Sequence, residues 1–284
     1  GVGLIIWAII EGPRWGWTSV ALLGGLIGGI GILIAFALVE RRLAHPMLDV
    51  RLFKNARFTA ASLSITTAFF ALFGFIFLIT QFLQLVQGFT PLQAGVRTLP
   101  FAIATGIMSP LAIVLMHRFG SRAIVTLGLL VMSAGFLIAA TVKVDTPYGG
   151  AVLISMVTIA AGLGLATSPA TDSVMGALPP EQAGAGAAVN DTTREFGGTL
   201  GVAVVGSVFL SVYGAKVIDG YRNLGLPEQY ESVVRESMGG GLAVAGQLPA
   251  DVSAQLAGVV KGAFIDGLSR GSLVAALVVV VGAV

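Results

Sequence analysis

The residues best equipped for chemistry lie in the stretch VNDTTREFGG, residues 189–198, where an arginine stands between two carboxylates. Asp191 precedes Arg194 by three positions and Glu195 by four, so a helix brings all three to one face. The run that follows, residues 196–215, carries no charge. The cluster has three interpretations: a latch or cytoplasmic gate, a solvated charge cluster at a surface, or a proton-carrying site.

The composition decides which solvent surrounds this cluster. Hydrophobic residues make up 56% of the 284 residues, charged residues only 11%, and the mean hydropathy is +0.93. A soluble domain carries roughly a quarter charged residues, so this chain lacks the polar groups to cover a water-exposed surface. The lipid bilayer is therefore its expected partner. The absence of cysteine excludes disulfides and thiolate chemistry, and a net charge of +2 gives no sign of a nucleic-acid partner.

Eight apolar segments reach or approach the roughly twenty residues that a membrane-spanning helix needs. The segments are residues 1–10, 19–39, 58–83, 92–116, 123–142, 149–170, 183–213 and 264–284. They are continuous rather than alternating, so the sequence predicts an all-α, polytopic membrane protein and not a membrane barrel. The chain starts and stops inside such runs, so we expect a longer protein. In the second segment, the spacing of Gly24 and Gly28, or of Gly25 and Gly29, favours close helix packing.

Basic residues set the expected orientation in the membrane. The connection ERRLAHPMLDVRLFKNARF has five Lys or Arg residues and HRFGSR has two, whereas the alternate turns are nearly bare. The two basic connections are therefore predicted to be cytoplasmic, and Trp15 and Trp17 to lie at the outer interface. Residues 215–262 are predicted to form an extracytoplasmic loop with short amphipathic helices, one of them capped by Asp251.

The same orientation sets the depth of the charged cluster. A helix over residues 183–213 is about 46 Å long at 1.5 Å per residue, which exceeds a hydrocarbon core of about 30 Å. Counting back from Lys216 places the cluster at the inner edge of the membrane. Asp172 and Glu181 are expected near the same surface, where they could join a gate.

The third apolar segment carries the candidate substrate cavity. Its six candidate residues follow one another at spacings of three or four, so they are predicted to share a helix face. They are Thr66, Phe70, Phe73, Phe77, Gln81 and Gln84. Aromatic rings flanked by amides suit a flat, apolar or cationic ligand. The alternative is that the phenylalanines face lipid or neighbouring helices.

Catalytic and metal sites are not expected. No serine, histidine and acid converge within the apolar segments, and His45 and His117 lie in loops without partner ligands. The sequence has no Walker motif, so no ATP is implied. The protein is therefore not predicted to be an enzyme, and no cofactor is expected.

Three stretches together resemble one family of transporters. QGFTPLQAGVRTLPFAIATG resembles a turn between two helices of the major facilitator superfamily, and is similar in particular to the fourteen-helix drug:proton antiporters of the EmrB/QacA type. LPPEQAGAGAAVNDTTREFGGTLGVAVVGSV resembles the segment around that family's penultimate helix, including the arginine matched by Arg194. GPRWGW, between the first two segments, also resembles that family.

The resemblance implies a domain organisation. Residues 1–57 would be the inserted pair of linker helices with its cytoplasmic connection, and residues 58–284 the C-terminal six-helix bundle. The N-terminal six-helix half is then a partner outside this chain. A loop signature of the form D-R-x-G-R-R corresponds here to HRFGSR, where His117 replaces the acid and Ser121 an arginine.

The resemblance also implies a function: a proton-coupled multidrug efflux transporter of the cytoplasmic membrane. Such a protein exports small lipophilic compounds, cationic ones among them, by alternating access, and is driven by the proton motive force. The alternative is a lipid-handling subunit or a non-transporting membrane scaffold. The family architecture adds Ser155, Thr158 and Thr167 to the cavity candidates. The gating candidates are Arg97, Arg118, Arg122, Asn190, Asp191, Arg194 and Glu195; an interfacial snorkelling role is the alternative for Arg97.

Overall fold

The computed structural model describes residues 1–43, 50–178 and 183–283. All regular structure in these ranges is helical, and seven helices are long and apolar enough to cross a membrane. The predicted all-α, polytopic membrane fold is therefore confirmed. The α-helices are α1 (Val2–Trp15), α2 (Val20–Glu40), α3 (Ala56–Gln81), α4 (Pro91–Phe119), α5 (Ser121–Ala139), α6 (Leu153–Met175), α7 (Ala183–Asn223), α8 (Glu231–Glu236), α9 (Met238–Ala245) and α10 (Ala250–Ala283). Shorter turns are η1 (Val50–Lys54), η2 (Phe82–Val86), η3 (Tyr148–Val152) and η5 (Glu228–Tyr230).

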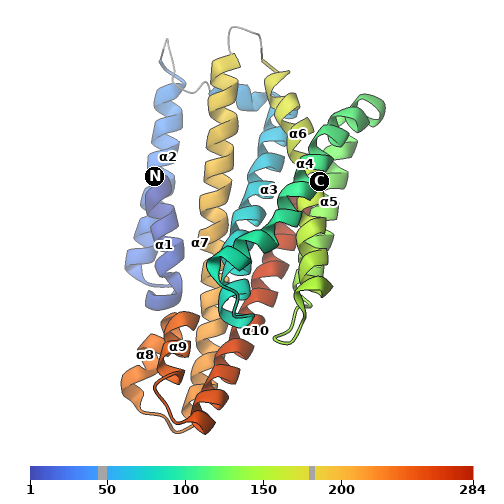
Figure 1. Cartoon of the computed structure of the whole chain (residues 1–284). Coiled ribbons are helices and arrows are strands. Elements are labelled where there is room, and N and C mark those ends of the chain that lie inside the picture. Colours follow the sequence, from blue (N-terminus) through green and yellow to red (C-terminus); the bar gives the residue numbers. More distant parts are fainter. Residues whose placement is uncertain (44–49, 179–182, 284) are drawn as a thin grey trace.

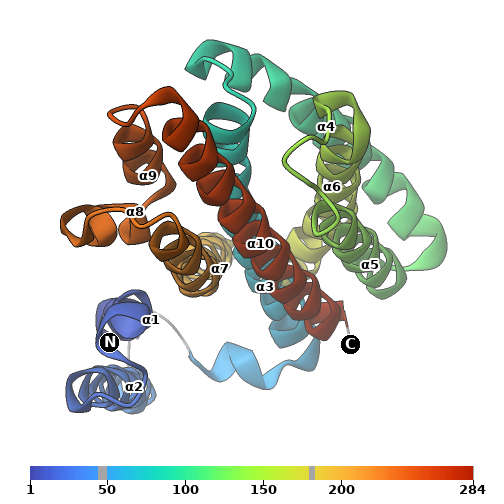
Figure 2. The same ribbon diagram turned by 90° about the horizontal axis from the view of Figure 1, so that it is seen from below.

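Helix α3 holds the bundle together. It packs against α7, α6 and α10, and α10 also packs against α7 and α5. Helix α4 is attached mainly through α6, and the α1–α2 pair is attached through the contact of α1 with α7. Figures 1 and 2 show this pair beside α7, on the far side of the molecule from α4 and α5.

Glycines allow α7 to approach α3 until the two backbones touch. A Cβ atom at Gly197 would overlap with the carbonyl oxygen of Thr66, and a Cβ atom at Gly201 would overlap with that of Phe70. These two glycines are four residues apart, so they lie on one face of α7. The α3–α7 crossing therefore depends on glycine at both positions.

The α1–α2 pair uses the same device. A Cβ atom at Gly25 would lie 3.1 Å from the ring of Trp7, and one at Gly29 would lie 2.6 Å from the side chain of Ile5. Gly24 and Gly28 have no such neighbour within 4 Å. Of the two glycine pairs predicted to allow close packing, Gly25 and Gly29 therefore contact α1, and Gly24 and Gly28 do not.

The region predicted as a loop, residues 215–262, is largely helical. Helix α7 continues to Asn223 and α10 begins at Ala250, with α8 and α9 between them; Figure 1 shows this group at one end of the molecule. Asp251 lies in the first turn of α10 rather than at a helix N-cap. The polar composition is misleading because charged residues alternate here with buried ones such as Val217 and Tyr221, at helical spacing.

Charged residues mark where α7 and α10 leave the apolar core. Helix α7 has 41 residues and α10 has 34, so they are about 60 and 50 Å long and extend well beyond a core of about 30 Å. Lys216 follows the charge-free run of α7, and its Nζ lies 3.4 Å from Oδ2 of Asp266 on α10. This ion pair is expected at the edge of the core, because charged groups are costly deeper in lipid.

One buried hydroxyl tests the packing of the projecting helices. Tyr213 is fully buried, and its hydroxyl donates a hydrogen bond to the carbonyl of Val234 in α8 (2.9 Å). Tyr213→Phe removes that donor, so we expect a loss of about 1–3 kcal/mol of folding free energy. The melting temperature of the detergent-solubilised protein measures it. Tyr230→Phe is the control, because the Tyr230 hydroxyl has no hydrogen bond within the described residues; equal melting of the two variants contradicts the prediction.

Candidate functional site

A groove lies between α3 and α4. Both helices pack against α6, but they scarcely touch each other. Helix α4 is the least buried of the seven long apolar helices, with 6% of its apolar span buried. Most of the α4 surface is therefore available to lipid or to another part of a larger protein.

The groove contains a pocket of about 410 Å³. Its walls come from α3 with η2 and from α4, and Met156 of α6 completes them. The lining residues are Phe75, Ile76, Ile79, Thr80, Leu83, Gln84, Pro91, Ala94, Gly95, Thr98, Phe101, Ala102 and Met156. None of these residues is charged. A mostly apolar pocket of this size is typical of sites for small organic molecules.

Gln84 is the polar group of the pocket that remains open to a ligand. The hydroxyls of Thr80 and Thr98 donate to carbonyls of their own helices (2.7 Å each). The amide of Gln84 has no hydrogen bond within the described residues. It belongs to η2, a π-helical turn at the end of α3, and such turns are frequent at functional sites.

The six residues of the stripe predicted on α3 do not all line the α3–α4 pocket. Thr66, Phe70, Phe73 and Phe77 lie against glycines of α7, although 37% of the Phe73 surface stays exposed. Of the six residues, Gln84 is the one that lines the pocket. The physical reason is that η2 has more residues per turn than an α-helix, so the spacing of 3.6 residues no longer holds there.

The other cavity candidates bond mainly within their own helices. Each donates a hydrogen bond to a carbonyl three or four residues earlier: Ser155 to Val152, Thr158 to Ile154, Thr167 to Leu163, Thr66 to Ser62 and Gln81 to Phe77. This local pairing is the usual one for hydroxyl side chains inside a helix. It leaves the three hydroxyls of α6 as acceptors rather than donors.

Arg194 lies in a polar contact between α7 and α6. Its Nη2 donates to the hydroxyl of Thr171 (3.2 Å), which in turn donates to Oδ1 of the buried Asn190 (3.3 Å). The guanidinium carbon lies 5.1 Å from the ring centre of Phe69 on α3. The Nε atom is buried and has no hydrogen bond within the described structure. Arg194 therefore connects three helices, and its Nε is a buried donor without an acceptor in the described structure.

The acids next to Arg194 do not join this contact. Asp191 and Glu195 are exposed, and in the described part of the chain neither forms an ion pair with Arg194. Asp172 is exposed as well, and Glu181 lies outside the described residues. The three charged residues are close together in the sequence, but the sequence does not show that the Arg194 side chain contacts Thr171 of α6 and not these acids.

The remaining gating candidates lie elsewhere. The guanidinium of Arg97 lies 3.7 Å from the ring centre of Phe89 and 5.7 Å from that of Tyr148, whose hydroxyl donates to the Arg97 carbonyl (2.6 Å). This contact ties the start of α4 to the start of η3. Arg118 and Arg122 are exposed at the α4–α5 turn.

Sequence reasoning missed two contacts of this face. Thr171 is one of six hydroxyl residues in α6, so its residue type gave no signal that it is the one facing Arg194. Ser121 replaces an arginine of the loop signature, yet its hydroxyl contacts Ser173 of α6 (2.7 Å) and the carbonyl of Pro169 (3.1 Å). The α4–α5 turn is therefore held to α6 by neutral hydrogen bonds.

Several bacterial resistance proteins are similar to this chain. Multidrug resistance protein Stp of Mycobacterium tuberculosis is 38% identical over 208 residues, which is 73% of this chain and 38% of that protein. Multidrug efflux pump LfrA of Mycolicibacterium smegmatis is 32% identical over 279 residues, 98% of this chain and 54% of that protein. The tetracenomycin C resistance and export protein of Streptomyces glaucescens is 28% identical, over 98% of this chain and 52% of that protein. The chain thus spans about half the length of these relatives or less.

A solved structure has a similar fold, and a family match covers most of the chain. The chain is similar in fold to a bacterial homologue of the human lysosomal transporter Spinster, determined in an inward-facing, unoccupied conformation. The TM-score is 0.53 at 16% sequence identity, and the match covers 100% of this chain and 67% of the other. Residues 1–202 match the Major Facilitator Superfamily. With its helical bundle, its uncharged groove and this match over most of its length, the chain belongs to the Major Facilitator Superfamily.

Proposed function

We propose that the chain is the C-terminal part of a longer, proton-coupled transporter that exports lipophilic compounds. The observation that carries the proposal is the uncharged pocket between α3 and α4, with the free amide of Gln84 at its wall. The relatives support it, since their names refer to multidrug efflux and to tetracenomycin C export. Their greater length supports a second half that faces the groove.

The proposed mechanism is alternating access. Two halves rock about a site between them, so the pocket is exposed to one side of the membrane at a time. A lipophilic compound enters from the bilayer, contacts Phe75 and Phe101, and accepts or donates a hydrogen bond at Gln84. Aromatic rings also tolerate a delocalised positive charge, which admits lipophilic cations. The proton motive force drives the cycle through acids that we expect mainly in the other half.

The orientation follows from the basic connections. They support an orientation with the α2–α3 and α4–α5 connections in the cytoplasm and the α8–α9 end outside. The protein would then lie in the cytoplasmic membrane, with the Arg194 contact at its inner edge. We assign this contact to a gate that holds α6 and α7 together in one state of the cycle.

Proton release tests the proposal directly. In everted vesicles containing the full-length transporter and energised by respiration, adding a substrate is expected to release protons from the interior, followed with a quenched pH dye. Candidate compounds are added one at a time, neutral and cationic. Absence of proton movement with every compound contradicts antiport and favours a lipid-handling or scaffold role.

A pocket-filling variant tests the site itself. A Cβ atom at Gly95 meets nothing within 4 Å, and Gly95 lines the pocket, so Gly95→Phe places a ring inside it. We expect the apparent KM for export to rise at least about tenfold, equivalent to about 1.4 kcal/mol of lost binding. Gly106→Phe is the matched control, because Gly106 is on the same helix with open space and outside the pocket. Equal KM values for the two variants place the substrate elsewhere.

A further inference from the structure

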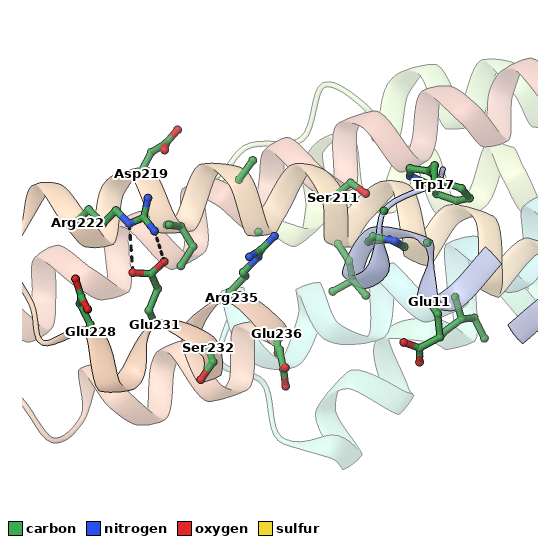
Figure 3. Close-up of a pocket in the computed structure, with 18 residues that line it drawn as sticks. Glu11, Trp17, Ser211, Asp219, Arg222, Glu228, Glu231, Ser232, Arg235 and Glu236 are labelled. Atoms are coloured by element: carbon green, nitrogen blue, oxygen red, sulfur yellow. Dashed lines mark hydrogen bonds and ion pairs between the residues drawn. The ribbon is translucent and has the colours of Figure 1, made fainter. Parts of the chain in front are cut away.

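A second cavity, of about 1230 Å³, lies between the α1–α2 turn and the outer part of α7 with α8 (Figure 3). Its lining residues are Ile10, Glu11, Gly12, Pro13, Gly16, Trp17, Leu210, Ser211, Gly214, Ala215, Ile218, Asp219, Arg222, Glu228, Glu231, Ser232, Arg235 and Glu236. It shares no residue with the α3–α4 pocket. The proposed transport mechanism makes no use of it.

This cavity straddles the depth at which α7 leaves the apolar core. Lys216 marks that depth, and the lining reaches six residues to either side of it, from Leu210 to Arg222, or about 9 Å each way. Trp17 lines the cavity with 51% of its surface exposed, and Trp15 is 55% exposed. Indoles favour the headgroup level of a bilayer. The cavity is therefore placed where lipid headgroups lie.

Its lining changes from apolar to charged along this direction. Ile10 and Leu210 lie at the core side, with Glu11 next to Ile10 in the chain, and Arg235 lies beside Gly214 near the edge of the core. Glu228 and Glu231 lie farther out, near Arg222. Figure 3 shows most of the labelled charged side chains around α8 and the end of α7, with Glu11 of α1 apart from them near Trp17. An occupant that fits both parts has an apolar portion and a polar head, as an amphiphile does.

The charges on one side favour a cationic group in that head. Arg222 donates two hydrogen bonds to the carboxylate of Glu231, through Nε and Nη2. Asp219 and Glu228 lie close enough to interact electrostatically with the same guanidinium. Three carboxylates thus surround one cation, and their surplus negative charge attracts an ammonium group and repels an anion.

Arg235 supplies the opposite charge. It lies against Gly214 of α7, 3.3 Å from a Cβ atom built there, and is exposed. Within the described residues it has no hydrogen bond or ion pair. An unpaired guanidinium is a strong donor to a phosphate. The cavity therefore offers one partner for a phosphate and several for an ammonium group.

We propose that this cavity binds a phospholipid with an amine headgroup, of the phosphatidylethanolamine type. The phosphate binds Arg235, the ammonium lies among Asp219, Glu228 and Glu231, and the acyl chains follow the apolar side toward Ile10 and Leu210. A purely anionic lipid satisfies Arg235 but meets the surplus carboxylates. A lipophilic cation satisfies the carboxylates but leaves Arg235 unpaired.

Lipid retention tests the proposal without any transport assay. The full-length protein is reconstituted in bilayers of equal parts phosphatidylethanolamine, phosphatidylcholine and phosphatidylglycerol, extracted, and examined by native mass spectrometry. We expect retained phosphatidylethanolamine to exceed phosphatidylglycerol about tenfold, and Arg235→Gln and Glu228→Gln each to remove most of that preference. Lys261→Gln and Asp251→Asn, outside the cavity, are the charge-matched controls and keep it. Retention without preference, or a preference unchanged in Arg235→Gln and Glu228→Gln, overturns the proposal.

Trp17 provides a second measurement at the cavity itself. Phosphatidylethanolamine brominated on its acyl chains is expected to quench a fluorescence component that Trp17→Phe lacks, and to do so more than brominated phosphatidylglycerol. Tetraphenylphosphonium is expected to leave that quenching unchanged. If tetraphenylphosphonium abolishes the quenching, or if both brominated lipids quench equally, the cavity is not a site for an amine phospholipid.

Discussion

Replacing Gly201 by leucine is expected to prevent α3 and α7 from packing and to abolish the stable bundle. A Cβ atom at Gly201 already overlaps with the Phe70 carbonyl oxygen, and a backbone atom cannot move aside as the end of a flexible side chain can. Overpacking typically costs about 1–3 kcal/mol, and we expect the upper end or more because two long helices must separate. Because α3 also packs against α6 and α10, the damage is expected to spread through the bundle.

The measurement is the yield and melting temperature of monodisperse protein in detergent, compared with Gly28→Leu. Gly28 also lies in an apolar helix, but a Cβ atom there meets nothing within 4 Å. The control receives the same added side chain and is expected to behave as wild type. Matching yields and melting temperatures for the two variants would falsify the close approach of α3 and α7.

Arg194→Ala is expected to lower the export rate at least about tenfold while the protein still inserts and folds. The change removes the guanidinium that contacts Thr171 and Phe69, and tenfold corresponds to about 1.4 kcal/mol, within the range for losing a hydrogen-bonded charge. Arg194→Lys keeps the charge but not the planar guanidinium, so we expect it to recover only part of the rate. The everted-vesicle assay gives the rate, and the maximal rate is expected to fall more than the KM rises.

Two further variants separate a gate from general destabilisation. Arg57→Ala removes an exposed arginine at the start of α3, near the same end of the bundle and outside the candidate sites, and is expected to transport normally. Thr171→Val removes the hydroxyl that links Arg194 to Asn190, so it and Arg194→Ala are expected to be non-additive when combined. Additive losses, or wild-type export by Arg194→Ala, would show that the contact is not part of the cycle.

The fold was predictable because membrane-spanning helices are specified by length and hydropathy. Continuous apolar runs give the seven long helices of the described structure and exclude strands. The extents of α7 and α10 were not predictable in the same way. Their ends project beyond the core, and there a buried residue such as Tyr221 lies among charged ones, so hydropathy alone predicts a loop.

The candidate site was less predictable because it depends on local irregularity. The α3 stripe assumes one helical period. The π-helical turn η2 breaks that period beside the pocket, so Gln84 faces the pocket whereas Phe77 does not. The charges around Arg194 are visible in the sequence, but the partner is Thr171, a neutral residue on another helix. Charged residues nearby in the sequence therefore predict the partner of an arginine less well than the hydrogen-bond acceptors around its guanidinium do.

The length of α7 has a mechanical consequence. In the proposed alternating-access cycle, a continuous helix of 41 residues that crosses the apolar core and continues outside it would act as a lever whose pivot lies within the bilayer. From the middle of the core to Asn223 is about 25 Å, so each 10° of tilt during rocking displaces the outer end by about 4 Å. In that cycle α8 and α9 would move with this end, because α8 packs against α7 and α9 packs against α8. A fluorescent label on α9 would then report, from the water, a rotation inside the membrane.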